Sequence, residues 1–404
     1  MLDRSAAIAL PGQRRAPGNM TISEPPLHPR GAGSERTGPL AGARLIVKDN
    51  IDAAGYVTTC GSRAYDPEPA AASAPAVARL VNAGALVVGK ANLDEFAWGV
   101  TGENTHWGRI ANPAHPGLTT GGSSGGTAAM IAAGLADIGL GTDTAGSIRI
   151  PAACCGIVGL RPRTGTTPVD GIHPLAPSFD VVGPMARDVG LLILAWEAMS
   201  GAHGAGSAGG ELRAGRAPLE APRVAAMRLP GWPAPAAPEH WGPIARVDVD
   251  RAALEPFWTV MHDESYRTHR ARYEAGAEGY GPAIRAKLAA AAASAGDVDA
   301  ARTSLAAHRD AFARVLDAHD AVLAPALGRS IPAAGVDEAT IRAELGWPSA
   351  LFSALDAAVA CVGGLQIVAR DEATALECAR QFEAALRRGA HPHAAHAHAD
   401  RSGS

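Results

Sequence analysis

Residues 121–149 read GGSSGGTAAMIAAGLADIGLGTDTAGSIR, and no other stretch of this 404-residue chain says as much about its fold. Its small residues predict a helix from about Thr127 to Leu135. A short buried strand is expected from Ile138 to Leu140, followed by the loop TDTAGS. Glycines surround three serines, and the stretch contains neither histidine nor cysteine. If the serines are reactive, the group that accepts a proton must come from elsewhere in the chain.

The preceding sequence alternates between strand and helix. The segment ARLIVKDNIDA (43–53) predicts a buried strand that reaches Lys48. VARLVNAG (77–84) predicts a helix closed by Gly84, and ALVVGKAN (85–92) predicts a second buried strand. Short apolar strands between helices indicate an α/β fold with a mixed central β-sheet, covered by helices on both faces.

Regular structure is also expected in the C-terminal half. Residues 280–318 predict two alanine-rich helices broken at Gly296, and AVLAPAL (321–327) predicts a strand. The segment from 363 to 388 predicts a strand followed by a helix. Glycine and proline punctuation predicts a run of turns from Pro151 to Pro184.

We expect one domain over residues 41–388, flanked by segments of low order. Residues 1–40 are rich in Pro, Gly, Arg and Ser without periodicity and predict a disordered leader. A Gly-, Ala- and Pro-rich surface connection is expected at about 201–238. The tail 389–404 holds four histidines, and its composition favours a flexible tail over a metal site. We therefore expect no metal.

Composition excludes several classes of partner. The formal net charge of −4 gives no basic footprint for nucleic acid or an anionic membrane. No uncharged apolar run approaches the roughly 20 residues of a membrane span. The five cysteines form no CxxC pair, which is typical of a reducing compartment. We expect a cytoplasmic protein that acts on a small molecule, and the sequence leaves a homodimer open.

Phosphate binding is a poor interpretation of the glycine cluster. GGSSGG matches neither GxxxxGK[ST] nor GxGxxG, and no lysine follows it within the stretch. A serine nucleophile fits better, but it needs a base and donors for an oxyanion. Without a histidine nearby, a lysine whose pKa is lowered by burial can serve as the base. Lys48 and Lys90 each end an apolar strand, and this reasoning leaves both as candidates.

Five segments together resemble the amidase signature family of hydrolases, and the layout is most similar to its indole-3-acetamide-hydrolase-like members. GGSSGG (121–126) and GLGTDTAGSIRIPAACCGIVGLRP (139–162) resemble the signature itself. The upstream segments are LIVKDNIDAAGYVTTCGS (45–62) and LDEFAWGVTGENTHWGRIANP (93–113), and SFDVVGPMARDV (178–189) follows downstream.

The resemblance implies a catalytic triad of two serines and a lysine. The nucleophile falls on Ser147, the bridging serine on Ser123 after a cis peptide bond, and the base on Lys48. This favours Lys48 over Lys90. The implied oxyanion hole is formed by backbone N–H groups of the nucleophile loop, namely those of Thr144, Ala145, Gly146 and Ser147.

Three further residues have expected roles beside the triad. We expect Ser124 to support Lys48 or the turn around it. Asp143 is expected to hold the nucleophile loop through structural hydrogen bonds or ion pairs. Trp98 lies in a segment that runs near the substrate cleft in the family, so it is a candidate for substrate binding as well as for packing.

The expected activity is hydrolysis of a small carboxamide through an acyl-enzyme on Ser147, without a cofactor. Two alternatives stay open. One is an amide-forming acyltransferase with the same triad, and the other is a catalytically impaired or partner-dependent subunit. The second alternative rests on SALDAAVACVGGLQIVAR (353–370), which is shorter than the corresponding region of the family.

Overall fold

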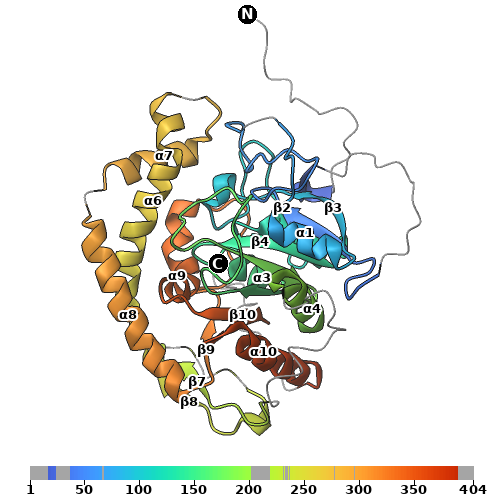
Figure 1. Cartoon of the computed structure of the whole chain (residues 1–404). Coiled ribbons are helices and arrows are strands. Elements are labelled where there is room, and N and C mark those ends of the chain that lie inside the picture. The colour runs from blue at the N-terminus through green and yellow to red at the C-terminus, as the bar shows by residue number, and fades with distance from the viewer. Residues whose placement is uncertain are drawn as a thin grey trace, which may run out of the picture.

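The computed structural model describes residues 17–23, 37–65, 68–201, 219–230, 232, 235, 237–276, 278–294 and 296–389. The predictions for most of the leader, for part of the 201–238 connection and for the tail from 390 onward lie outside these ranges. Within them the chain has the expected α/β fold, with helices on both faces of a mixed sheet (Figure 1).

The described strands form one eleven-stranded sheet in the order β1-β3-β2-β4-β6-β5-β10-β11-β9-β7-β8. Strand β2 is parallel to β3 and β4, and β7 is parallel to β8 and β9, whereas the other neighbours are antiparallel. The strands are β1 (Thr21–Ser23), β2 (Arg44–Lys48), β3 (Leu86–Ala91), β4 (Ile138–Asp143), β5 (Val158–Arg161), β6 (Val181–Ala186), β7 (Val224–Met227), β8 (Ala245–Val247), β9 (Ala321–Pro325), β10 (Ala358–Val362) and β11 (Leu365–Ala369).

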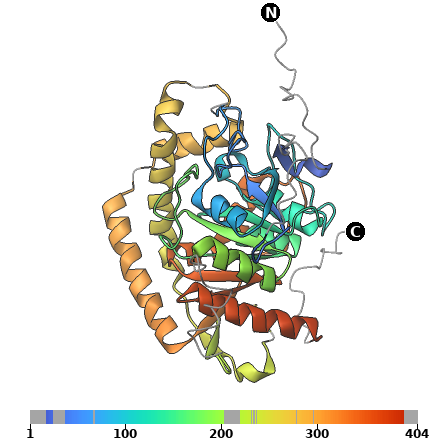
Figure 2. The ribbon, with the colours of Figure 1, turned by 45° about the vertical axis from the view of Figure 1, so that its right-hand side comes forward.

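The helices form three groups around this sheet. One face is covered by α1 (Pro75–Asn82), α4 (Val189–Ser200) and α10 (Glu372–Arg387). The other face is covered by α2 (Gly125–Ala132), α3 (Arg149–Cys155) and α9 (Glu338–Ala354). Along one flank, α6 (Leu254–Glu274) and α8 (Val298–Ala318) lie side by side, with α7 (Pro282–Ala292) packed on α6 (Figures 1 and 2). Short 3₁₀ turns are η1 (Pro17–Asn19), η2 (Glu95–Ala97), η3 (Glu239–Trp241) and η4 (Arg251–Ala253).

Strand alternation decides which face of the sheet Lys48 occupies. Leu45 and Val47 belong to the apolar cluster under α1, α4 and α10, whereas Ile46 packs with α2 and α3. Because side chains two residues apart point to the same face, Lys48 shares the face of Ile46. The strand therefore brings its last side chain beneath the helix that begins just after Ser123 and Ser124.

Glycines on β4 let that helix lie close to the sheet. A Cβ atom on Gly139 would lie 2.4 Å from the Thr127 side chain, and one on Gly141 would lie 2.8 Å from Ser124 Oγ. Real Cβ atoms do not approach other atoms this closely. The small residues of the stretch at 121–149 thus fix the distance between the serine turn and the strand.

The predicted run of turns from Pro151 to Pro184 is wrong outside residues 162–180, which contain neither a helix nor a strand. The rest of the region contains α3, β5 and the first part of β6. Pro151 lies in the first turn of α3, where a missing N–H costs nothing. Pro184 lies inside β6, opposite Leu140 of β4, although proline is rare in a central strand. The glycines and prolines of this region therefore do not all mark turns.

Two strands lie in the segments expected to be a disordered leader and a surface connection. Strand β1 falls within the expected disordered leader 1–40, and β7 falls within the expected surface connection 201–238. That leader prediction is therefore wrong for residues 17–23, which pack beside β3. Both strands have at most four residues, which is too short for an alternating pattern to be recognised.

Two further findings concern the described part of the chain. No helix in it combines the length and apolar character that crossing a bilayer requires. The five cysteines all lie within the described ranges, where they are buried and form no disulfide.

Candidate active site

Lys48 is fully buried and hydrogen-bonded to both serine-bearing segments of the signature. Its Nζ donates to Ser123 Oγ at 2.8 Å and to Thr142 Oγ1 at 2.8 Å. Burial lowers the pKa of Lys48 to about 7, although Asp94, Asp143 and Asp180 act in the opposite direction. A substantial fraction of the amine is therefore neutral near pH 7 and able to accept a proton.

Lys90 lies in a different environment. Its Nζ is 3.1 Å from Asp49 Oδ1, and both side chains are fully buried. It also donates to Thr58 Oγ1 at 3.1 Å. In the described part of the chain its contacts are with Asp49 and with the backbone and side chain of residues 57 and 58, and it makes no hydrogen bond with a serine of the stretch 121–149. The geometry favours Lys48 as the base on physical grounds.

The serine turn is tied to both Lys48 and the nucleophile loop. The Gly122–Ser123 peptide bond is cis. The Ser124 N–H donates to the Ser147 carbonyl at 3.1 Å, and Ser124 Oγ donates to the Thr142 carbonyl at 3.3 Å. Ser124 thus joins the two segments, whereas its side chain makes no hydrogen bond with Lys48.

Ser147 lies next to this network with a free hydroxyl. Its side chain is 7% exposed and makes no hydrogen bond with another residue of the described ranges. The Ser123 hydroxyl is bonded to Lys48 and not to Ser147. Among the three triad candidates, the structure therefore joins two directly and places the third through the backbone contact with Ser124.

Asp143 organises the loop that carries Ser147. Its carboxylate accepts hydrogen bonds from the N–H groups of Gly146 and Ile148, at 2.8 and 3.1 Å. The Arg149 guanidinium is 2.9 Å away, and that of Arg161 is 3.5 Å away. Burial alone would raise the pKa of Asp143, but the two arginines bring it well below its usual range. Asp143 is therefore an anion that holds the loop in shape.

Three of the four predicted oxyanion donors are unoccupied. The N–H groups of Thr144, Ala145 and Ser147 make no hydrogen bond within the described part of the chain. The N–H group of Gly146 is already used by Asp143. The Thr144 side chain donates to Asp180 at 2.6 Å, which anchors the start of the loop. An oxyanion beside Ser147 would thus find free donors, but Gly146 would have to leave Asp143 to join them.

The Trp98 side chain is packed in the core, whereas its backbone carbonyl accepts hydrogen bonds from two charged side chains. Its side chain is 2% exposed and lies 6.4 Å from the His262 ring. Its carbonyl accepts hydrogen bonds from Lys287 Nζ and, at 3.3 Å, from Arg342 Nη2. A role of Trp98 in substrate binding stays a prediction, since the buried ring presents little surface.

Sequence reasoning missed several polar residues around the triad candidates. Asn50 donates to Thr142 Oγ1 at 3.1 Å and so orients an acceptor of Lys48. Asp94 accepts N–H hydrogen bonds from Thr101 and Gly102. The proximity of Asn50 to Lys48 in VKDN was a usable signal. Nothing in the sequence pairs Asp94 with the serine turn.

Asp94 leaves no space for a side chain on the residue before Ser123. A Cβ atom on Gly122 would lie 1.9 Å from Asp94 Oδ2. Asp94 is fully buried, and burial raises its pKa to about 7. Because its carboxyl group is held by two backbone N–H groups, it cannot easily move away. The position of Ser123 therefore depends on Gly122 having no Cβ.

Replacing Gly122 by alanine is expected to destabilise the protein by about 1–3 kcal/mol, as overpacked buried sites do. The added methyl group must displace Asp94 or the serine turn, so amide turnover should fall as well. Thermal unfolding and turnover measure the two effects. Gly346→Ala is the matched control, because its Cβ would lie 3.5 Å from Ile150 Cδ1 in ordinary contact. Equal unfolding midpoints for both variants would contradict the expectation.

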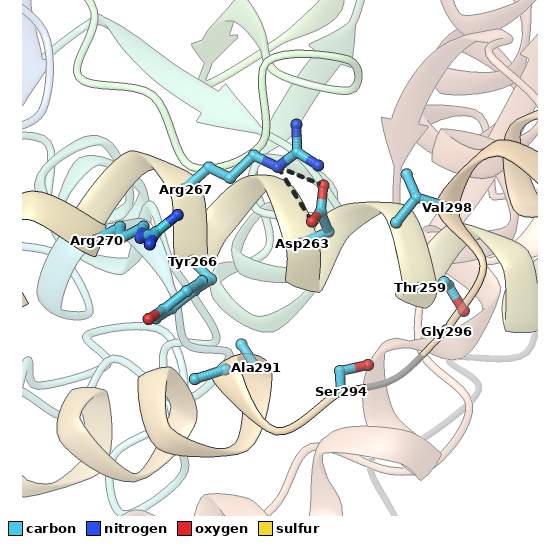
Figure 3. Close-up of a pocket in the computed structure, with 10 residues that line it drawn as sticks. Thr259, Asp263, Tyr266, Arg267, Arg270, Ala291, Ser294, Gly296 and Val298 are labelled. Carbon is cyan, nitrogen blue, oxygen red and sulfur yellow. Dashed lines mark hydrogen bonds and ion pairs between the residues drawn. The ribbon is translucent and has the colours of Figure 1, made fainter.

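Two cavities lie away from Ser147. One of about 450 Å³ lies between α6 and the α7–α8 connection, and its lining includes Asp263, Tyr266 and Arg270 (Figure 3). The other, of about 530 Å³, is lined among others by Cys60, His173 and His269. No triad candidate lines either cavity. In the described ranges, no three His, Cys, Asp or Glu side chains are grouped so as to hold a metal ion.

Comparison with known proteins finds similar sequences for the part of the chain that contains the triad candidates. The profile of a family described as Amidase matches residues 27–210, which include all three triad candidates. The chain is 48% identical over 172 residues, 43% of its length, to the A-type subunit of the glutamyl-tRNA(Gln) amidotransferase from Symbiobacterium thermophilum, covering 35% of that protein. It is 42% identical over 231 residues, 56% of its length, to AtzE of the 1-carboxybiuret hydrolase from Pseudomonas sp. strain ADP, covering 50% of that protein.

The likeness in structure extends over more of the chain. A crystal structure of an amidase superposes with a TM-score of 0.74 and 28% identity, covering 86% of this chain and 85% of the other. The sequence matches, by contrast, span half or less of the curated relatives. The signature segments lie within the matched residues, and over residues 27–210 the chain is similar to the amidase family.

Proposed function

We propose that the protein hydrolyses a small carboxamide to a carboxylic acid and ammonia or an amine. The observation that carries the proposal is the hydrogen bond of 2.8 Å between Ser123 Oγ and a buried lysine whose pKa is lowered to about 7. A serine next to a neutral amine can pass a proton in either direction. Relatives whose names denote amide hydrolysis support the same reaction class.

In the proposed reaction Ser147 is the nucleophile. Its hydroxyl turns toward Ser123 as the substrate enters, since catalytic hydrogen bonds often form only in the substrate complex. Ser147 Oγ attacks the carbonyl carbon, and its proton passes to Ser123, whose own proton passes to Lys48. The oxyanion accepts hydrogen bonds from the free N–H groups at Thr144 and Ala145.

The leaving group departs when the relay runs backwards. Lys48 returns a proton through Ser123 to the leaving nitrogen, the C–N bond breaks, and ammonia or an amine leaves an acyl-Ser147 ester. Water then attacks the ester and loses a proton to the same relay, and the acid is released. The proton that leaves with the amine is replaced by one from water, so Lys48, Ser123 and Ser147 return to their starting states and the cycle needs only water as co-substrate.

A panel of simple amides tests the proposal. We expect the purified protein to release ammonia from at least one member of a series from acetamide through arylacetamides to acyl-amino-acid amides. Ammonia release and acid formation should be equimolar, because hydrolysis produces one of each. Release of ammonia without the acid, or no release from any amide together with no covalent labelling of Ser147, would contradict the proposal.

Transfer to an amine or to a partner protein is the second candidate. It is favoured by the identity of 48% to a protein named as part of an amidotransferase. Both curated relatives described above are named as subunits, so a partner is compatible with this chain, as is a homodimer. Adding amine acceptors to the panel separates the two candidates: hydrolysis yields the acid, and transfer yields a new amide.

A further inference from the structure

A cluster of charged side chains surrounds the Trp98 carbonyl. Lys287 of α7 and Arg342 of α9 both donate to this oxygen. Between them lies Glu338, which is 3.1 Å from Lys287 Nζ and 3.0 Å from Arg342 Nε. Two cations thus share one close carboxylate, and Asp94 is the other acidic group that acts on Lys287.

Helix α9 connects this cluster to the nucleophile loop. Ser349 of α9 lies against the loop, since a Cβ atom on Gly146 would lie 2.5 Å from Ser349 Cβ. Arg342 precedes Ser349 by seven residues, so it lies on the same helix face, about 10 Å away along the axis. Asp94 lies against Gly122 and electrostatically couples to both Lys48 and Lys287. The cluster therefore stands at the edge of the proposed site.

We propose that Arg342 and Lys287 bind a carboxylate of the substrate, at the end remote from the amide that is cleaved. The substrate class is then the monoamide of a short dicarboxylic acid. The inference rests on the proposed hydrolysis and adds to it the chemical group that selects the substrate.

Both side chains are partly exposed, and Arg342 also has donors that are not used in the described part of the chain. Arg342 uses its Nε for Glu338 and one Nη2 donor for Trp98, which leaves the N–H groups of Nη1 unassigned among the described contacts. Its side chain is 25% exposed and that of Lys287 is 18% exposed. Neither is sealed in the core, as Arg149 and Arg161 are. A planar guanidinium with free N–H groups is well suited to a carboxylate.

The local balance of charge also favours an anion. Glu338 neutralises only one of the two cations. Burial raises the pKa of Asp94 to about 7, so this carboxyl group is partly neutral near pH 7. His262, which faces Trp98, has its pKa lowered by burial and by Arg342, so its ring is favoured in the neutral form and does not alter this balance. An incoming carboxylate would therefore meet net positive charge.

Matched pairs of substrates test the inference. Succinamate, glutaramate and adipamate are compared with butanamide, pentanamide and hexanamide, which have the same numbers of carbon atoms. We expect the wild type to favour one of the carboxylates by about tenfold or more in kcat/KM, the effect of a charge-assisted hydrogen bond. Arg342→Gln should lower that preference about tenfold, chiefly through KM, and Arg342→Lys should restore part of it.

Arg329→Gln is the control, because Arg329 pairs with Glu344 on another face of α9. It should leave the preference unchanged. Equal losses on the charged and neutral substrates in Arg342→Gln would show that Arg342 only holds Trp98 and would overturn the inference. A wild type without any preference for the carboxylates would do the same.

Binding to an inactive variant separates this inference from the proposed function. Calorimetric titration of Ser147→Ala with the preferred carboxylate should show binding that Arg342→Gln weakens about tenfold. If the wild type hydrolyses neutral amides but the carboxylates do not bind, only the inference fails. If the carboxylate binds but no amide is cleaved and Ser147 is not labelled, only the proposed function fails.

Discussion

Ser147→Ala is expected to abolish covalent labelling by a fluorophosphonate and to lower amide turnover by about a thousandfold or more, as loss of a serine nucleophile does. The reason is that Ser147, among the three serines of the stretch 121–149, is slightly exposed and has beside it backbone donors that are free in the described ranges. The 7% exposure of Ser147 admits a small reagent, whereas Ser123 and Ser124 are fully buried. Mass spectrometry of the labelled protein measures the first effect, and ammonia release measures the second.

The same experiment contains its control. Ser200→Ala removes a hydroxyl at the end of α4, on the opposite face of the sheet, and should leave both labelling and turnover unchanged. Equal melting temperatures for the two variants and the wild type would show that the fold is intact. Full labelling of Ser147→Ala would assign the nucleophile to another residue and remove the basis of the proposed mechanism.

The elements near the signature could be predicted because each has a clear local pattern. Strands β2 and β3 are apolar runs that each contain a single lysine, and α1 ends before Gly84 as a helix closed by glycine should. Helix α6 has no such pattern. Its buried face includes Glu264, Ser265 and His269, so the sequence of α6 lacks the regular spacing of apolar residues that predicts a helix.

The parts of the site that could not be predicted depend on contacts between distant segments. Resemblance to a family predicts that Ser123 and Lys48 act together, whereas physical reasoning from the sequence alone leaves Lys90 as a rival. The Asp49 carboxylate beside Lys90 distinguishes the two lysines, and that contact is visible only in three dimensions. Likewise, Arg342 reaches Trp98 across 244 residues of sequence. No local pattern encodes such a pairing.

The predicted role of Gly146 as an oxyanion donor also depends on a contact that the sequence does not reveal. Asp143 lies three residues before Gly146 in the sequence, but the sequence does not show which N–H groups donate hydrogen bonds to its carboxylate. In the structure two of them, at Gly146 and Ile148, are taken by Asp143. Three of the four donors that the resemblance implied are therefore free within the described ranges, and the fourth, at Gly146, is occupied by the loop's own anion.

Lys48→Met is expected to lower amide turnover by about a thousandfold and to remove the acidic limb of the pH profile. In the wild type, kcat/KM should rise with pH through about 7, because only the neutral amine accepts a proton and the pKa of Lys48 is lowered to about 7. Turnover should level off above that pH. A rate profile measured from pH 5 to pH 9 checks the prediction.

The free energy of unfolding should also depend on pH through the ionisation of Lys48. The folded pKa of Lys48 lies below its ordinary value of 10.5, so the unfolded chain binds more protons between about pH 7 and pH 10. The free energy of unfolding contributed by this group therefore rises with pH across that window. Chemical unfolding of Lys48→Met should lack this rise, whereas a profile identical to that of the wild type would mean that Lys48 is not the titrating group.

The matched control is Lys90→Met combined with Asp49→Asn. Removing Lys90 alone would leave a buried carboxylate without its partner and destabilise the fold by about 3–5 kcal/mol. Neutralising both members of the pair avoids that charge while deleting the rival amine. This double variant should keep the acidic limb near pH 7. If the limb disappears there and persists in Lys48→Met, the base is Lys90, and the hydrogen bond between Lys48 and Ser123 has only a structural role.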